Sequence, residues 1–193
     1  MRENFRAINA GEVTFAKLID EPPPFTTSVS MPSLTKVQRS GLVYEKKVQE
    51  HLRHLALVGG FRNLAVLSNQ WISYRLVGDE EWFVRYCQPD CLLVEGDKIT
   101  IIEIKIQHTG DSWKQVRQLY EPVLKIIFPS YHFSAIEICR WFDPHTPFPE
   151  TFYYCEEAEI FNAVENRFGI HVFNSKGRGK GERASGEIGV GGK

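Results

Sequence analysis

Two apolar runs separated by a short polar interval dominate the middle of the chain. Residues 88–94 and 98–106 are rich in β-branched and aliphatic side chains, and Glu95-Gly96-Asp97 separates them. Gly and Asp tolerate the backbone angles of a tight reversal, so the pattern predicts a β-hairpin. Three ionisable side chains interrupt the apolar runs, namely Asp90, Glu103 and Lys105. Because side chains alternate between the faces of a strand, Glu103 and Lys105 should share one face.

Apolar residues at helical spacing predict a helix over 41–56, with Tyr44, Val48 and Leu52 in its buried stripe and Ser40 as its N-cap. A second helix is predicted over the range 113–128, where Pro122 should kink or restart it. The remaining pattern predicts strands over 69–77, 81–87 and 131–141, a helix over 156–168 and an edge strand over 171–173.

The two ends of the chain differ from its centre. Residues 1–40 are expected to be an irregular arm that wraps the domain or contacts a partner, with a short strand or helical turn over 12–19. A loop is expected over 143–149. Residues 41–173 would then form the main domain, and the Gly-rich, basic stretch 174–193 a flexible tail.

Composition narrows the class of protein. The chain has 193 residues, 42% hydrophobic and 24% charged, which is typical of one globular domain. Its formal net charge is −1, so any nucleic-acid surface must come from local basic patches. No apolar run approaches a membrane span and the start has no signal-peptide pattern, so we expect a cytoplasmic protein without a membrane partner. None of the four cysteines forms a C-x-x-C pair, which favours buried thiols over an iron–sulfur cluster.

Two explanations fit the charged residues of the hairpin. In the first, Glu103 and Lys105 form a surface ion pair and Asp90 caps the start of the hairpin. In the second, the two carboxylates hold a hard divalent cation through oxygen ligands, and the neighbouring Lys105 orients or deprotonates a water molecule.

Pro89-Asp90 followed by Glu103-Ile104-Lys105 resembles the signature of the PD-(D/E)xK nuclease superfamily, in particular its RecB-like and lambda-exonuclease-like members. The resemblance covers about residues 41–141. It implies an α/β fold of restriction-endonuclease-like type, with an αβββαβ core in which helices flank a central mixed sheet.

The resemblance also implies roles for individual residues. Asp90, Glu103 and the carbonyl of Ile104 would hold Mg²⁺ or Mn²⁺, with Glu45 as a third acid and Lys105 beside the attacking water. Glu50 is an alternative to Glu45, and Glu45 is also explained as a solvated residue in the first turn of its helix. Family members carry a Gln on the helix after E-x-K, for which Gln115 is favoured over Gln118. The residues expected to contact the DNA backbone are Lys46, Lys47, Lys114, Arg117 and Tyr120.

The function implied is a metal-dependent deoxyribonuclease that hydrolyses phosphodiester bonds, with exonuclease-like processing favoured by the Gln and Tyr of the second helix. A Holliday-junction resolvase or nicking endonuclease on the same fold is one alternative, and a non-catalytic DNA-binding module is the other. DNA is the expected partner, and a homodimer or a helicase or recombination partner fits the same family. DNA repair, recombination, phage biology and defence all remain open as settings.

Overall fold

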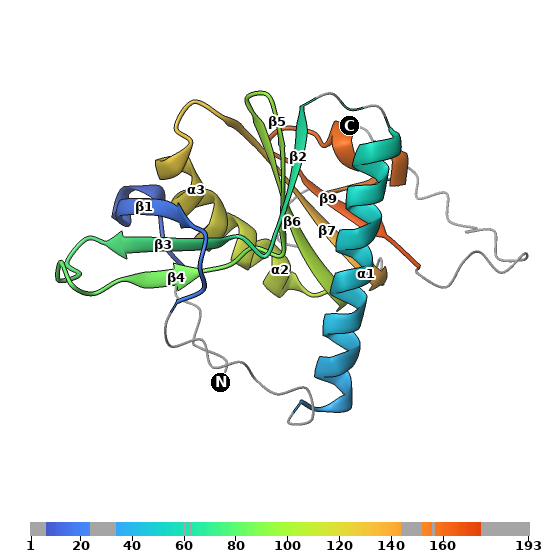
Figure 1. Ribbon diagram of the computed structural model, residues 1–193, viewed down its shortest axis with the longest axis horizontal. Coiled ribbons are helices and arrows are strands. Elements are labelled where there is room, and N and C mark those ends of the chain that lie inside the picture. The colour runs from blue at the N-terminus through green and yellow to red at the C-terminus, as the bar shows by residue number, and fades with distance from the viewer. Residues whose placement is uncertain are drawn as a thin grey trace, which may run out of the picture.

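The structure, a computed structural model, describes residues 7–23, 34–59, 61, 63–143, 152–155 and 157–174, the side chains of 157–159 excepted. Over these residues the chain has an α/β fold built on a six-stranded mixed sheet with the strand order β2-β5-β6-β7-β9-β8 (Figure 1). Its strands are β2 (Leu64–Ser68), β5 (Cys91–Glu95), β6 (Lys98–Gln107), β7 (His132–Trp141), β8 (Phe152–Cys155) and β9 (Phe168–Val172).

A smaller antiparallel sheet has the order β1-β3-β4. It consists of β1 (Val13–Ile19), β3 (Trp71–Leu76) and β4 (Arg85–Cys87). The helical elements are η1 (Ala10–Glu12), α1 (Lys36–Val58), α2 (Gly110–Gln115), the π-helix η3 (Val116–Tyr120), α3 (Glu121–Ile127) and the 3₁₀ helix η4 (Glu157–Asn162). None of the helices in the described part of the chain is long and apolar enough to cross a membrane.

The predicted hairpin is confirmed as β5 and β6. The strands pair antiparallel from Cys91↔Ile102 to Glu95↔Lys98, and Gly96 adopts a positive φ of 58° in the turn between them. β6 then pairs in parallel with β7, which places Glu103 opposite Glu137. The helical segment α2-η3-α3 makes the crossover that a parallel pair requires.

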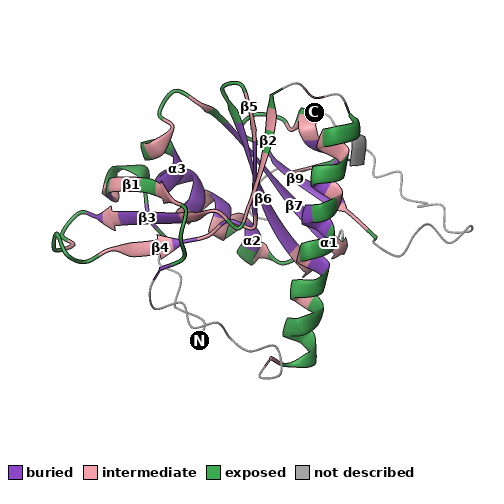
Figure 2. Cartoon of the chain, in the orientation of Figure 1, coloured by how far each residue is buried: buried purple, intermediate pink, exposed green. Residues whose placement is uncertain are grey.

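Helices cover both faces of the central sheet. α1 packs on one face, where Val48 and Leu52 meet Ile102 and Ile104 in one buried cluster. The α2-η3-α3 segment covers the other face, and the small sheet packs beyond it (Figure 1). The central strands are therefore buried along most of their length, whereas the first turns of α1 are exposed (Figure 2).

α1 begins earlier than predicted. Thr35 caps it, since the Thr35 hydroxyl accepts a hydrogen bond from Gln38 N at 3.2 Å while Gln38 Oε1 accepts from Thr35 N at 2.8 Å. This reciprocal pair is a capping box. The prediction of Ser40 as the cap is wrong, because Ser40 lies inside the helix and donates to Lys36 O at 2.9 Å.

The strands before the hairpin also differ from the prediction. The strand expected over 69–77 is β3, and the one over 81–87 is shortened to β4, but both belong to the small sheet. In the central sheet, β5 pairs instead with β2 at the edge, and the sequence did not predict that strand. Asn69 has a φ of 54° and turns the chain from β2 into β3, so two adjacent strands enter different sheets.

Within the first forty residues, the short strand that was one of two alternatives over 12–19 is confirmed as β1, which pairs with β3. Pro122 helps to hold the N-terminal residues before β1 against the helical segment α2-η3-α3. Proline has no N–H to donate, so it leaves the Gln118 carbonyl without a donor from the next turn. Ile8 N–H donates to that carbonyl at 2.8 Å, and Glu121 N–H reaches back five residues to Val116 O. The predicted interruption of the helix at Pro122 is thus confirmed as the π-helix followed by α3.

The C-terminal prediction is partly wrong. Residues 157–162 form the short 3₁₀ helix η4 in place of a helix over 156–168, and β8 was not predicted. β9 lies between β7 and β8, so it is an internal strand rather than an edge strand. The expected loop over 143–149 and the tail beyond 174 lie almost entirely outside the described residues. All four cysteines are buried free thiols, as expected.

Gly169 allows β9 to pack closely between its neighbours. A Cβ at this position would lie 2.7 Å from Tyr153 Cζ, 2.8 Å from its hydroxyl oxygen and 3.1 Å from Ile136 Cγ1. We expect Gly169→Ala to lower the free energy of unfolding by about 1–3 kcal/mol, measured by urea denaturation, because the added methyl overpacks this contact. Gly41→Ala is the control: its Cβ would meet nothing within 4 Å, and in mid-helix it should stabilise by about 0.5–1 kcal/mol. Equal effects of the two substitutions would contradict this explanation.

Candidate active site

Asp90 lies at the point where the β5–β6 ladder ends. The last pair of the ladder is Cys91↔Ile102, and beyond it Asp90 Oδ2 accepts a hydrogen bond from Ile104 N–H at 2.7 Å. Asp90 therefore caps the hairpin and is also held against the strand that carries Glu103. Burial raises the pKa of Asp90, although Lys105 and the Ile104 N–H oppose that rise.

The Ile104 carbonyl lies on the same side of β6 as Asp90. The N–H and C=O of one strand residue point to the same neighbour, so the contact of Ile104 N–H with Asp90 fixes the direction of the carbonyl. The carbonyl oxygen is thus on the Asp90 side of the strand, as a shared ligand role with Asp90 would require.

Glu103 and Lys105 share a face of β6 and form an ion pair, with Lys105 Nζ donating to Glu103 Oε1. Glu103 is only 1% exposed, and its second oxygen, Oε2, has no hydrogen-bond partner among the described residues. Burial and the neighbouring Asp90 raise the pKa of Glu103 to about 8, although Lys105 lowers it. Burial lowers the pKa of Lys105, but Glu103 and Asp90 together raise it above its usual value. The surface-pair explanation is therefore wrong for Glu103, which is a buried carboxylate.

Glu45 comes to the acids from α1. It is half-buried, and its Oε1 accepts a hydrogen bond from Gln49 Nε2 at 3.2 Å. Burial and Asp90 raise the pKa of Glu45 to about 7, while Lys105 lowers it. The opposite effects of Asp90 and Lys105 on this pKa show that the charges of the hairpin act on Glu45. Glu50, the alternative, is exposed on the helix, so the geometry favours Glu45.

Gln49 connects α1 to the hairpin and was missed by the sequence reasoning. Its side chain is 4% exposed, and Nε2 also lies 3.1 Å from Asn69 Oδ1 and 2.9 Å from Asp90 O. Asn69 N–H donates to the same Asp90 carbonyl at 3.2 Å. The signal available in the sequence was a polar residue one turn after Glu45 and beside the apolar stripe of the helix.

We expect Gln49→Ala to lower the free energy of unfolding by about 2 kcal/mol, because it removes a buried donor from several acceptors. The same change should move Glu45 away from Asp90. Urea denaturation measures the first effect, and Gln107→Ala, at an exposed position on β6, is the control with an expected change under about 0.5 kcal/mol. If Gln49→Ala lowered the free energy of unfolding no more than Gln107→Ala does, Gln49 would not be part of the site.

The residues predicted on the second helix lie in different environments. Tyr120 is buried, and its hydroxyl donates to Gln88 O at 3.2 Å. Burial, Glu103 and Asp90 raise the pKa of Tyr120 well above its usual value. The phenol therefore lies within the core and does not present a surface to DNA.

The other predicted helix residues are more accessible. Gln115 is half-buried at the end of α2, and Arg117 forms a 2.6 Å ion pair with Glu121. Lys114 is exposed and lies 3.8 Å from Asp111. Lys46 and Lys47 are exposed on α1, directly after Glu45.

A further acid beside the hairpin was also missed. Glu137, on β7, is fully buried, and its Oε2 lies 2.8 Å from His108 Nδ1 and accepts a hydrogen bond from Ser112 Oγ. Burial raises the pKa of Glu137, although Ser112 and His108 lower it. Glu137 is a single acid in an alternating strand pattern, and that pattern does not indicate that its side chain is buried.

The carboxylates have the chemistry of a site for a hard cation. Glu103 Oε2 is a buried oxygen to which no described residue donates, and burial together with the like charge of Asp90 raises the pKa of both Glu45 and Glu103. Oxygen ligands suit Mg²⁺ or Mn²⁺, and Mg²⁺ usually takes only one or two protein carboxylates and keeps several waters. In the described part of the chain, no three His, Cys, Asp or Glu side chains are arranged to hold a metal ion by themselves. Asp90, Glu103 and the Ile104 carbonyl fit such a cation as a partial shell that waters would complete.

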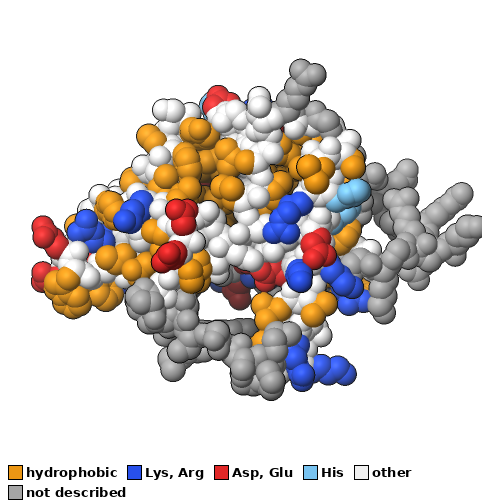
Figure 3. Space-filling view, in the orientation of Figure 1, with side chains coloured by type: hydrophobic (Ala, Val, Ile, Leu, Met, Phe, Trp, Pro, Cys, Tyr) orange, Lys and Arg blue, Asp and Glu red, His pale blue; other side chains and the backbone are white. Residues whose placement is uncertain are grey.

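The molecular surface separates charges of opposite sign around this region. Acidic side chains are visible between the small sheet and α1 (Figure 3). Lys and Arg side chains gather over α1 beside them (Figure 3).

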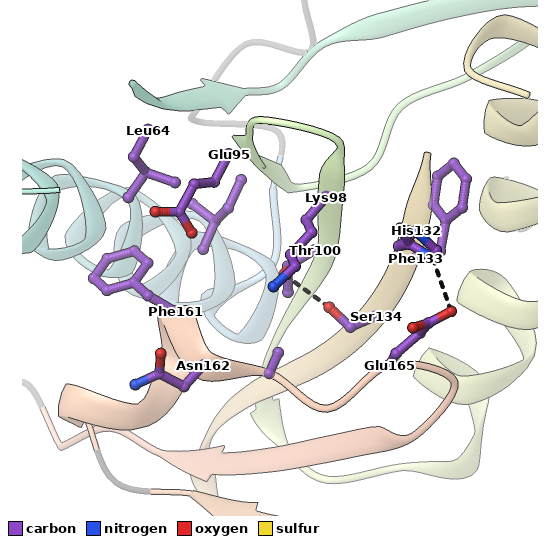
Figure 4. A pocket seen from close by; sticks show the side chains of 12 residues that line it. Leu64, Glu95, Lys98, Thr100, His132, Phe133, Ser134, Phe161, Asn162 and Glu165 are labelled. Atoms are coloured by element: carbon purple, nitrogen blue, oxygen red, sulfur yellow. Dashed lines mark hydrogen bonds and ion pairs between the residues drawn. The ribbon is translucent and has the colours of Figure 1, made fainter. Parts of the chain in front are cut away.

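A separate cavity of about 270 Å³ lies at the other end of the hairpin (Figure 4). Glu95 and Lys98 border it at the β5–β6 turn, and the hydroxyls of Thr100 and Ser134 lie 2.8 Å apart within it. None of the predicted site residues lines this cavity.

Comparison of the chain with protein-family models, with curated proteins and with solved structures finds no match.

Proposed function

We propose that this chain is a Mg²⁺- or Mn²⁺-dependent DNA nuclease of the PD-(D/E)xK type. The observation that carries the proposal is the convergence of Asp90, Glu103 and Lys105 where the β5–β6 ladder ends, with Glu45 supplied by α1. Three acids and one base gathered in a largely buried position are unfavourable for folding unless a ligand uses them.

The order of the central elements supports the same proposal. α1 is followed by β2, β5 and β6, and the α2-η3-α3 segment then leads to β7. The pairings along this sheet are antiparallel, antiparallel and parallel. We infer that these elements are the restriction-endonuclease-like αβββαβ core, with β3 and β4 inserted between β2 and β5, β1 added before α1 to complete the small sheet, and β8 and β9 extending the far edge.

The chemistry follows from the residues present. Asp90, Glu103 and the Ile104 carbonyl would hold the cation, with Glu45 acting directly or through water. When bound, Mg²⁺ or Mn²⁺ supplies Lewis-acid stabilisation of the phosphate and lowers the pKa of a bound water. Lys105 orients the attacking water and stabilises its deprotonated form by its positive charge. Gln115, at the end of α2, is the residue proposed to hold the water or a phosphate oxygen.

Contacts to DNA are proposed for the exposed cations nearest the acids. Lys46 and Lys47 follow Glu45 on α1, and Lys114 lies on α2. Their ammonium groups suit phosphate oxygens, which position the duplex without reading its sequence. The paired Arg117 and the buried Tyr120 are less suited to that role.

The test is cleavage of end-labelled linear duplex, circular single-stranded and branched DNA, and of an RNA of matching sequence, in Mg²⁺, in Mn²⁺ and in EDTA. The parent protein is compared with Asp90→Asn, which keeps the shape of the side chain. We expect metal-dependent cleavage of at least one DNA substrate that is absent in EDTA and in the variant. Cutting of circular DNA would exclude a purely exonucleolytic enzyme, and preference for branched DNA would favour a resolvase.

Absence of cleavage with every substrate and both metals would overturn the proposal. If the folded protein then still bound DNA, the non-catalytic binding module would replace it, and Asp90 and Glu103 would be structural residues.

A further inference from the structure

Glu137 lies beside the acids of the hairpin without taking part in the chemistry proposed above. It occupies the position on β7 that pairs with Glu103 on the neighbouring strand β6, so the two side chains share one face of the sheet. Glu137 is 0% exposed, and its Oε1 has no hydrogen-bond partner among the described residues. A buried carboxylate oxygen without a donor is unfavourable unless another state of the protein supplies one.

The other oxygen of Glu137 is firmly held. His108 Nδ1 and Ser112 Oγ both bond to Oε2. Ser112 Oγ also lies 2.8 Å from Thr109 O, so its one proton is shared between the two acceptors, and the start of α2 is tied to the same carboxylate. His108 and Ser112 therefore form a cluster around one oxygen of the carboxylate. Its effect is to fix the carboxylate in place and leave Oε1 as the available acceptor.

Lys105 is the candidate donor. It follows Glu103 by two residues on the same face of β6, diagonal to Glu137 across the strand pair. Glu137 raises the pKa of Lys105, and Lys105 lowers that of Glu137, so the two charges interact. In the present structure, however, the Lys105 ammonium donates to Glu103 Oε1.

A cation held by Asp90 and Glu103 would change that arrangement. The cation and the Lys105 ammonium carry like charge and would compete for the carboxylate of Glu103. Glu103 Oε2 is open to the cation while Lys105 stays on Oε1, but the two like charges then repel each other across one carboxylate. Transfer of the ammonium to another acceptor relieves that repulsion. Among the acids beside it, Glu137 offers a buried oxygen that no described residue uses.

We propose that Glu137 is a positioning residue that receives the Lys105 ammonium when a divalent cation occupies Asp90 and Glu103. The inference rests on the proposed function, since it needs a cation at that pair. Glu137 thereby allows the cation to bind without displacing Lys105 from the site, and it orients the ammonium toward the face of β6 where water is activated. His108 and Ser112 keep the acceptor in place for both states.

The test is a double-mutant cycle read by Mn²⁺ affinity, which needs no turnover. Mn²⁺ binding is measured by electron paramagnetic resonance for the parent, Glu137→Gln, Lys105→Met and the double variant. We expect Glu137→Gln to weaken Mn²⁺ binding about tenfold, within the range for residues that support a metal ligand. In the Lys105→Met background the same change should have an effect of less than about twofold, because no ammonium remains to be relocated. Glu165→Gln, an exposed acid near the far cavity, is the matched control and should bind Mn²⁺ like the parent.

The outcomes separate the two proposals. Equal weakening by Glu137→Gln in both backgrounds, or no weakening in either, would overturn the transfer of Lys105 while leaving the metal site intact. No Mn²⁺ binding to the parent, or binding unchanged by Asp90→Asn, would overturn the metal site itself and the transfer with it.

A crystal structure of the parent protein with Mg²⁺ tests the same inference without a substitution that endangers folding. We expect Lys105 Nζ within about 3 Å of Glu137 Oε1, the usual range for such a hydrogen bond. An ammonium that stays on Glu103 beside the bound cation would contradict the proposal.

Discussion

Lys105→Ala should lower the rate of DNA cleavage by about 10²–10⁴-fold, the range for removal of a group that assists proton transfer. Lys105 is the cation that contacts Glu103, and its ammonium is the charge placed to stabilise a deprotonated water. Its removal should also raise the pKa of Glu103 further, since Lys105 is what lowers it. More of the carboxyl would then be protonated at neutral pH, and the metal would bind more weakly. Single-turnover cleavage at saturating Mg²⁺ and DNA separates the rate effect from weaker binding.

Lys98→Ala provides the matched control for that substitution. Lys98 is the first residue of β6, exposed and at the end of the strand remote from Asp90. We expect parent-like cleavage from this variant and similar thermal denaturation curves for both variants. Cleavage by Lys105→Ala at the parent rate would reduce Lys105 to a structural counter-ion of Glu103.

The hairpin and its charged residues were predictable because their determinants are local. Alternating β-branched residues, a Gly-Asp turn and a spacing of two residues between Glu103 and Lys105 lie within one short stretch. The hydrogen bond from Ile104 N–H to Asp90 then follows, because any hairpin with this turn brings residue 90 opposite the strand just beyond Ile102. The assignment of Glu45 came from the resemblance, because the helical pattern also fitted a solvated residue in the first turn.

The missed features depend on long-range packing. β2 is only five residues long and is separated from β3 by two residues, so only its pairing with β5 assigns it to the central sheet. Glu137 stands in an alternating run that is equally typical of a half-exposed strand. β9, which pairs with β7 across more than thirty residues of sequence, makes β7 internal, and His108 and Ser112 cover the acid on the face of the sheet. Such burial is decided by which strands become neighbours, and the local pattern does not encode it.

In EDTA, the protein should lose stability as the pH rises from about 5 to about 8. The pKa of Glu103 is raised to about 8 and that of Glu45 to about 7, and Asp90 is raised in the same direction. In this window the folded state keeps protons that the unfolded chain has already released. The stabilisation is therefore complete below the ordinary carboxyl pKa and is lost as the pH rises through the folded-state values. The raised pKa of Lys105 acts above pH 10 and does not oppose this trend.

The expected loss for Glu103 alone is on the order of 3 kcal/mol, which is a large part of the stability of an ordinary domain. Urea denaturation at pH 5, 6.5 and 8 measures it, and Glu103→Gln should flatten the dependence because it removes the titrating group, whereas Glu165→Gln should not. Mg²⁺ at a hundredfold excess over its dissociation constant should restore about 2.7 kcal/mol at pH 8. It should restore much less at pH 5, where protons already neutralise the acids. Stability that rises between pH 5 and 8 in EDTA would mean that these carboxyls are already ionised and paired in the folded protein, and the site would then have no excess negative charge for a cation to neutralise.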